Sequence, residues 1–167
     1  MRVYIPATLA MLQSLNESGE FVPVGGTAFA LTPALREAYT AGDDEELSEA
    51  ALREAARASL RLLDGEVGDL APLPPRRVVV AADVDGAALR PDLDAAVVRL
   101  SGPVPRAAIA AVHVDGAEAE GAVRAAVAAV DAADLGDLDA ELAIGDVEDF
   151  DLGWYATQEL PFLLELL

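Results

Sequence analysis

One pattern recurs three times in this chain and limits its fold more than any other feature: a short apolar strand, a threonine, and the start of a helix. The three copies are YIPATLAML, FALTPAL and WYATQEL, with Thr8, Thr32 and Thr157 at the junctions. A threonine at such a junction accepts a hydrogen bond from a backbone N–H of the first helical turn. Strands that alternate with helices predict a sheet with helices packed on it.

The other apolar segments extend this alternation. We expect further strands at 76–84, 94–102 and 107–115, and further helices at 44–63 and 116–134. The run of Val in the first of these strands is typical of a strand buried on both faces. Two segments are interpreted as loops because of their composition: 64–75, which is rich in Pro and Gly, and the acidic stretch 135–151.

These elements fit in one domain over residues 1–167, with the loop 64–75 between an N-terminal βαβα part and a C-terminal strand-rich part. We predict an α/β or α+β fold, in which a single mixed sheet of about five or six strands carries helices packed on it. Ala dominates the apolar residues, and aromatic residues make up only 5% of the chain. The core therefore has to rest on the Val and Leu clusters.

The composition excludes several kinds of chemistry. Without Cys there are no disulfides, thiolate zinc sites or cysteine nucleophiles, and without Lys there is no Schiff-base or phosphate-loop lysine. His113 is the only histidine, so a metal cage of several histidines is impossible. We expect neither a resident metal nor a cofactor.

The formal net charge of −19 at pH 7 bears on partners and location. Such a charge repels the phosphates of nucleic acids and anionic lipid surfaces, so we expect no nucleic-acid partner. No apolar run approaches the roughly 18 residues of a membrane span, and the first residues lack a signal-peptide pattern. We therefore expect a cytoplasmic protein without a membrane partner. Its carboxylates form a solvated surface, face a basic protein or mimic a nucleic acid.

Two of the expected strands end in the same tripeptide, Val-Asp-Gly, and supply the first candidate site. Asp83 and Asp85 share one face at the first strand end, and His113 and Asp115 share one at the second. If these strands are neighbours and parallel, the four groups meet at the carboxyl edge of the sheet, where open α/β folds bind ligands. Arg99 would stand on a neighbouring strand.

Such an edge would offer His113 and Asp83 as catalytic groups and the other three as ligand-binding groups. Carboxylates with one His could also hold Mg²⁺ or Mn²⁺. The alternative is that Asp-Gly marks a turn after each strand and that His113 is a half-buried residue with a backbone partner.

A second candidate is an arginine stripe in the helix expected at 44–63. Arg53, Arg57 and Arg61 follow each other at intervals of four and share one helix face, where like charges repel by a few tenths of a kcal/mol. Something has to offset this repulsion. Either Glu49 and other carboxylates of the chain pair with the stripe, or the stripe binds an anionic ligand, since Arg forks suit carboxylates and phosphates.

The last residues, PFLLELL, carry more apolar surface than one helix face can bury. We expect a short helix after Thr157, because Pro161 is tolerated near a helix start. Phe162, Leu163 and Leu166 are the candidate residues for an interface, and a homodimer is one partner that this surface would fit.

Several segments together resemble a known family: MRVYIPAT, FALTPALREAY, EAARASLRLL, RRVVVAADV and the closing WYATQEL. The resemblance is to short actinobacterial proteins with a domain of unknown function, which open with MRVY(I/V)PAT and close near WYA-x-QE. It covers nearly the whole chain. It implies a stand-alone bacterial cytosolic protein and transfers no catalytic residue.

Three interpretations of function remain open at this point. The leading one is a small soluble cytosolic protein that acts by binding or assembly, without catalysis. The second is a small enzyme or a ligand- or metal-binding protein that uses the Asp/His cluster at the sheet edge, which requires a cavity with an accessible His113. The third is an acidic inhibitor or nucleic-acid mimic.

Overall fold

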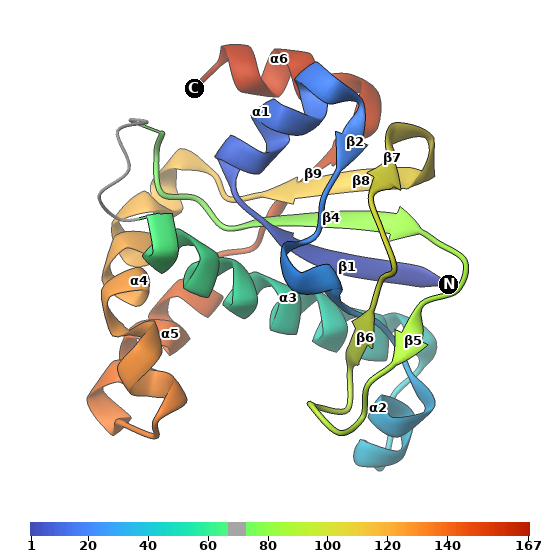
Figure 1. The fold of residues 1–167 in the computed structure, drawn as a ribbon. Coiled ribbons are helices and arrows are strands. Elements are labelled where there is room, and N and C mark those ends of the chain that lie inside the picture. Colours follow the sequence, from blue (N-terminus) through green and yellow to red (C-terminus); the bar gives the residue numbers. More distant parts are fainter. Residues whose placement is uncertain (67–72) are drawn as a thin grey trace.

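The computed structural model describes residues 1–66 and 73–167 (Figure 1). The strands are β1 (Arg2–Ala7), β2 (Glu20–Phe21), β3 (Thr27–Phe29), β4 (Val78–Asp83), β5 (Ala88–Leu89), β6 (Val97–Arg99), β7 (Val104–Pro105), β8 (Ile109–Val114) and β9 (Gly153–Ala156). The helices are α1 (Leu9–Ser18), α2 (Pro33–Ala38), α3 (Asp44–Glu66), α4 (Glu120–Asp134), α5 (Leu138–Glu148) and α6 (Leu160–Glu165).

The strands form a main sheet of seven in the order β5-β6-β3-β1-β4-β8-β9, and β2 and β7 form a small sheet of their own. The expected combination of helices with a sheet is confirmed. The main sheet has more strands than the five or six expected, because a two-residue strand such as β5 leaves no pattern in the sequence. All of its described strand pairs are antiparallel.

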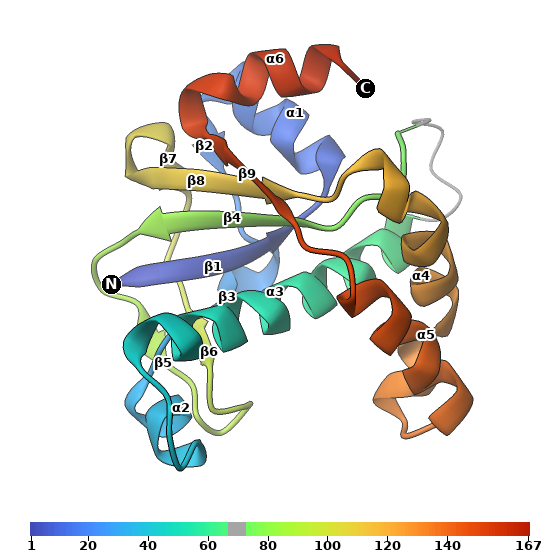
Figure 2. The same ribbon diagram turned by 180° about the vertical axis from the view of Figure 1, so that it is seen from behind.

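Helices cover the two faces of the main sheet unequally. On one face, α1 and α6 lie together over β1, β4 and β8, and the largest core cluster is here (Figures 1 and 2). It holds alternate strand residues such as Ile5, Val80 and Val112 against Leu12 and Leu160. On the other face the long helix α3 packs its alanines on β1, β3 and β4. Small side chains let this helix approach the sheet closely.

The threonine junctions form largely as expected. The Thr8 hydroxyl accepts a hydrogen bond from the Met11 N–H at 3.3 Å, and the Thr32 hydroxyl accepts one from Leu35 at 3.0 Å. At the third junction the hydroxyl of Thr157 donates instead to the carbonyl of Ile109 at 2.9 Å, so this threonine ties β9 to β8. The strand–Thr–helix order is thus preserved where the capping hydrogen bond is absent.

The acidic stretch 135–151 was expected to be a loop, and this expectation is wrong. Its centre is the helix α5, whose first turn is capped by the Asp137 carboxylate accepting from the Ala140 N–H at 2.9 Å. Ala140, Ile144 and Val147 recur at helical spacing and are buried against α4. The many carboxylates around these three residues obscure their period in the sequence.

The loop expected at 64–75 begins later than predicted, since α3 continues to Glu66. The part of that loop at 67–72 lies outside the described residues. The helix that starts at Pro33 is short and ends at Ala38. In residues 1–66 and 73–167, none of the helices combines the length and apolar character needed to cross a membrane.

One row of side chains shows where the uncovered part of the sheet lies. Val79 on β4 is opposite His113 on β8, and His113 is opposite Trp154 on β9. Val79 is fully buried under α3, His113 is half-buried, and Trp154 is 61% exposed. Because α3 does not extend over β8 and β9, their face on this side remains open beside the α4–α5 hairpin.

Candidate functional site

The Asp/His cluster expected at one edge of the sheet does not form. The strands β4 and β8 are neighbours, but they run antiparallel, so that Val78 pairs with Val114 and Ala82 pairs with Ile109. Asp83 and Asp85 therefore lie at the opposite end of these strands from His113 and Asp115. The apolar pattern of a strand gives its faces but not its direction, and the direction was the wrong part of the hypothesis.

The carboxylates of this cluster have separate surroundings. Asp83 accepts a hydrogen bond at 2.7 Å from Nε of Arg2, and this ion pair lowers the pKa of the Asp83 carboxyl. Asp85 is exposed in the turn after β4. Arg99 is exposed on β6, and no carboxylate of the described residues lies within 4 Å of its guanidinium.

Asp115 is fully buried and belongs to the framework of the fold. Its carboxylate accepts from Nε and Nη2 of Arg77 at 2.8 and 2.7 Å, and also from the Arg77 backbone N–H at 2.8 Å. The same guanidinium donates to the carbonyl of Phe150 at 2.8 Å. This ion pair joins the start of β4, the end of β8 and the segment that leads into β9.

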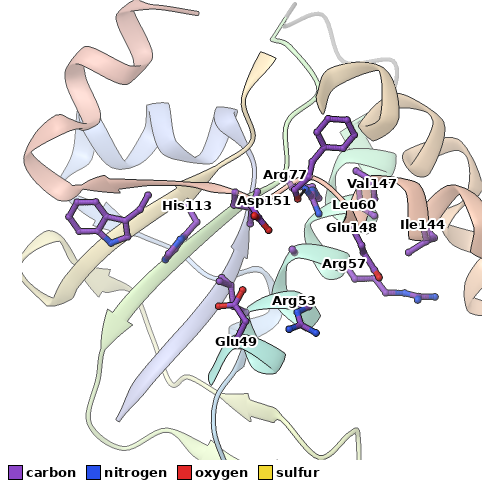
Figure 3. Close-up of a pocket in the computed structure, with 15 residues that line it drawn as sticks. Glu49, Arg53, Arg57, Leu60, Arg77, His113, Ile144, Val147, Glu148 and Asp151 are labelled. Carbon is purple, nitrogen blue, oxygen red and sulfur yellow. Dashed lines mark hydrogen bonds between the residues drawn. The ribbon is translucent and has the colours of Figure 1, made fainter. Parts of the chain in front are cut away.

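A cavity of about 360 Å³ lies on the open face of β8 and β9 (Figure 3). Figure 3 shows Glu49, Arg53 and Arg57 on the α3 side of this cavity, His113 on the sheet, and Glu148 on α5. Phe150, Asp151, Leu152 and Trp154 complete the wall near β9. His113 and two of the three arginines of the stripe, Arg53 and Arg57, thus meet in one place, whereas Arg61 is not part of the lining.

The three arginines of the stripe differ in their partners. Arg57 donates to Asp134 and Glu141 at 3.1 and 3.0 Å, and Arg61 donates to Asp134 at 2.7 Å. The hydrogen bond to Glu141 is the main reason why the pKa of Arg57 is raised. Within the part of the chain that the structure describes, Arg53 has no carboxylate within 4 Å, so the expected pair with Glu49 does not form.

His113 lines the cavity with both ring nitrogens free of hydrogen bonds to any described residue. Burial lowers the pKa of the imidazole, and the charge of Arg2 lowers it further. The neutral ring therefore keeps one N–H donor and one acceptor at pH 7. Asp115, two residues further, is held by Arg77 and does not orient the ring.

The charges that line the cavity are unbalanced. Arg57 and Arg77 are neutralised by carboxylates that are not part of its lining. What is left is one cation, Arg53, and three carboxylates, none of which forms an ion pair with a described residue. These carboxylates are Glu49, Glu148 and Asp151. The cavity has an excess of negative charge.

Trp154 was missed by the sequence analysis. It is the only tryptophan of the chain, and it alternates with Tyr155, which packs on the core of the other face. This alternation was the available signal, because it places the indole on the face opposite the core. Arg77 was missed as well, since its partner comes from a different strand end.

The candidate interface residues at the C-terminal helix separate into two groups. Leu163 is buried in the largest core cluster with Leu160, and these two residues attach α6 to the sheet. Phe162 and Leu166 are exposed on the outer side of α6. Leu163 is therefore a core residue and is not available for an interface.

A comparison with protein-family models matches residues 1–164 to a family of unknown function, DUF6912. No curated protein and no solved structure matches the chain. In the described ranges 1–66 and 73–167, no three side chains of His, Cys, Asp or Glu are grouped so that they could hold a metal ion.

Proposed function

Because the chain belongs to this family of unknown function, which brings no activity with it, we propose a function from the cavity alone. The protein is a binding protein without catalysis, and the cavity on the open face of β8 and β9 accepts a small organic cation such as an amine or a guanidine. Recognition of this kind needs an aromatic face and uncompensated carboxylates.

One observation carries the proposal: the exposed indole of Trp154 lies on the wall of a cavity with three unpaired carboxylates. Tryptophan is the best of the aromatic rings for attracting a cation, with about 0.5–2 kcal/mol depending on how dry the contact is. Glu148 and Asp151 add the Coulomb attraction, and the net charge of −19 raises the local concentration of cations.

Arg53 and His113 would set which cation is accepted. Arg53 favours a cation that also carries a carboxylate or another acceptor over one that carries positive groups alone, so arginine should bind more tightly than agmatine or spermidine. The neutral imidazole of His113 offers a hydrogen bond without adding charge. Binding is favoured over catalysis because His113 has no group of the described residues to orient it, and no hydroxyl, thiol or lysine nucleophile of the described residues lines the cavity.

The test uses the single tryptophan as an intrinsic reporter. Purified protein is titrated with agmatine, spermidine and arginine, and in parallel with citrate and phosphate, while Trp154 fluorescence is followed. We expect a saturable change with the cations. The double variant Glu148→Gln/Asp151→Asn should lower the affinity for the cations about ten-fold, because each charge removed costs about 0.5–1 kcal/mol of binding free energy.

The matched control is Asp139→Asn, which removes a carboxylate from the outer side of the same helix and should leave the affinity within about two-fold. A response to the anions that disappears in Arg53→Ala would contradict the proposal and favour an anionic ligand on the arginine stripe. The absence of any saturable response to the cations would also contradict it.

A further inference from the structure

The outward face of α5 carries apolar residues that the fold does not use. Ala140, Ile144 and Val147 point toward α4, and the opposite side of the helix presents Leu138 and Leu142, which are 81% and 68% exposed. The turn before this helix adds Leu135, which is also exposed. We call the surface formed by residues 135, 138, 142 and 145 the leucine face.

The spacing of this face matches the pattern by which one helix packs on another. Leu138, Leu142, Gly145 and Asp149 follow each other at intervals of four, three and four, which keeps them in one row along the helix. Gly145 costs this helix about 1 kcal/mol relative to Ala. A Cβ atom added at Gly145 would meet no atom of the described residues within 4 Å, so the fold itself does not require a glycine there.

The charges around the leucine face decide what can cover it. Asp139 and Asp146 are exposed along one side of the row, and Asp149 at its end is exposed as well. A second copy of this chain would bring the same carboxylates against them, and anionic lipid headgroups would be repelled in the same way. A partner with positive charges beside an apolar row meets the carboxylates and the leucines together.

We propose that the leucine face docks an amphipathic helix of a basic partner protein, with apolar residues on Leu138 and Leu142, close backbone approach at Gly145, and Arg or Lys on the flanking aspartates. This is the helix-in-groove mode of recognition, in which apolar anchors supply affinity and the charges supply specificity. The leucine face lies on the side of α5 away from the cavity, so the inference does not depend on the proposed ligand.

The probe is a labelled peptide of about 18 residues with Leu at the a and d positions of successive heptads and Lys elsewhere. Its fluorescence anisotropy is measured with the protein in about 0.15 M salt, where charge attraction beyond roughly 8 Å is screened. The wild type should bind it, and the same peptide with Glu in place of Lys should not bind. The double variant Leu138→Ser/Leu142→Ser should lose at least about ten-fold in affinity.

Two further variants separate the leucine face from general attraction. Gly145→Gln fills the row without removing a charge and should lower the affinity for the peptide at least about five-fold. Phe162 is an exposed apolar residue on α6, and Phe162→Ser should leave the affinity unchanged. Equal binding to all variants, or no binding, would overturn the proposal. A wild-type dimer in sedimentation velocity that the double leucine variant dissociates would overturn it in favour of a second copy.

Discussion

The guanidinium of Arg77 and the carboxylate of Asp115 form a two-point ion pair in the interior, with N–O distances of 2.8 and 2.7 Å and with both side chains buried. Arg77 also donates to the carbonyl of Phe150. The pair therefore holds the segment that carries Asp151 and leads to Trp154. A buried pair of this kind stabilises the fold only while both partners are present.

The Asp115→Asn variant tests this role. It leaves a buried guanidinium without its counter-charge, and we expect the free energy of unfolding to fall by about 3–5 kcal/mol in urea denaturation. The matched control is Asp83→Asn in the exposed pair with Arg2, which should cost less than about 1 kcal/mol. An equal loss in the two variants would show that Asp115 is not buried with Arg77.

His113 supplies a prediction on pH. Burial lowers its pKa, so the unfolded chain binds a proton at this position more readily than the folded chain. Stability from this group is complete above the ordinary pKa of about 6.5 and is lost as pH falls from there toward the lowered pKa. The single histidine gives one set of ring signals in an NMR titration, and we expect their midpoint below 6.5.

The lowered pKa of His113 also predicts that the wild type and a histidine-free variant differ in how their thermal stability depends on pH. Between pH 7.5 and 5.5 the wild type should lose more thermal stability than His113→Gln, whose side chain does not titrate. The carboxylates contribute equally to both proteins, so the difference in Tm isolates the histidine. An NMR midpoint above 6.5, or a larger loss in the variant, would mean that the carboxylates of the cavity outweigh the burial of the ring and would contradict this prediction.

The helix α5 gives a third prediction. Asp137→Ala removes the carboxylate that accepts from the Ala140 N–H, and loss of such a cap costs about 1 kcal/mol of stability. Asp139→Ala removes the same charge two residues later, inside the first turn, and should cost less. Urea denaturation of the two variants compares them, and identical values would argue against a helix that starts at Leu138.

The C-terminal helix α6 gives a fourth prediction. Leu163→Ala opens a space in the core and should cost about 2–5 kcal/mol, whereas Phe162→Ser and Leu166→Ser should stay within about 0.5 kcal/mol of the wild type. Thermal unfolding at two protein concentrations makes the comparison. A strong loss for Phe162→Ser that depends on concentration would show that α6 forms the contact of a dimer.

Much of the fold could be predicted because its signals are local. Thr8 and Thr32 mark their junctions through hydrogen bonds that span three residues, and the run at Val78–Val80 is apolar because β4 is covered on both faces. The helix α5 escaped prediction because only three of its positions face the core. The charge of the remaining positions gave the segment the composition of a loop.

The site could be predicted only in pieces. The sequence pointed to Arg53, Arg57 and His113 separately. No local pattern places a helix stripe beside a strand residue about 60 positions away, because that placement follows from tertiary packing. The direction of β8 against β4 depends on the path of the chain through β5, β6 and β7, whose strands have two or three residues. The antiparallel register separates Asp83 from Asp115 and brings Trp154 beside His113.

The most direct test of the proposed binding site is an NMR titration with agmatine that follows the indole N–H of Trp154 and the ring signals of His113. Each is the only residue of its type in the chain, so both assignments are immediate. If the cavity binds the cation, both sets of signals shift together along one saturable curve, and the shift is weakened in Glu148→Gln/Asp151→Asn. Signals that stay in place while agmatine reaches millimolar concentrations would contradict the cavity as a cation site.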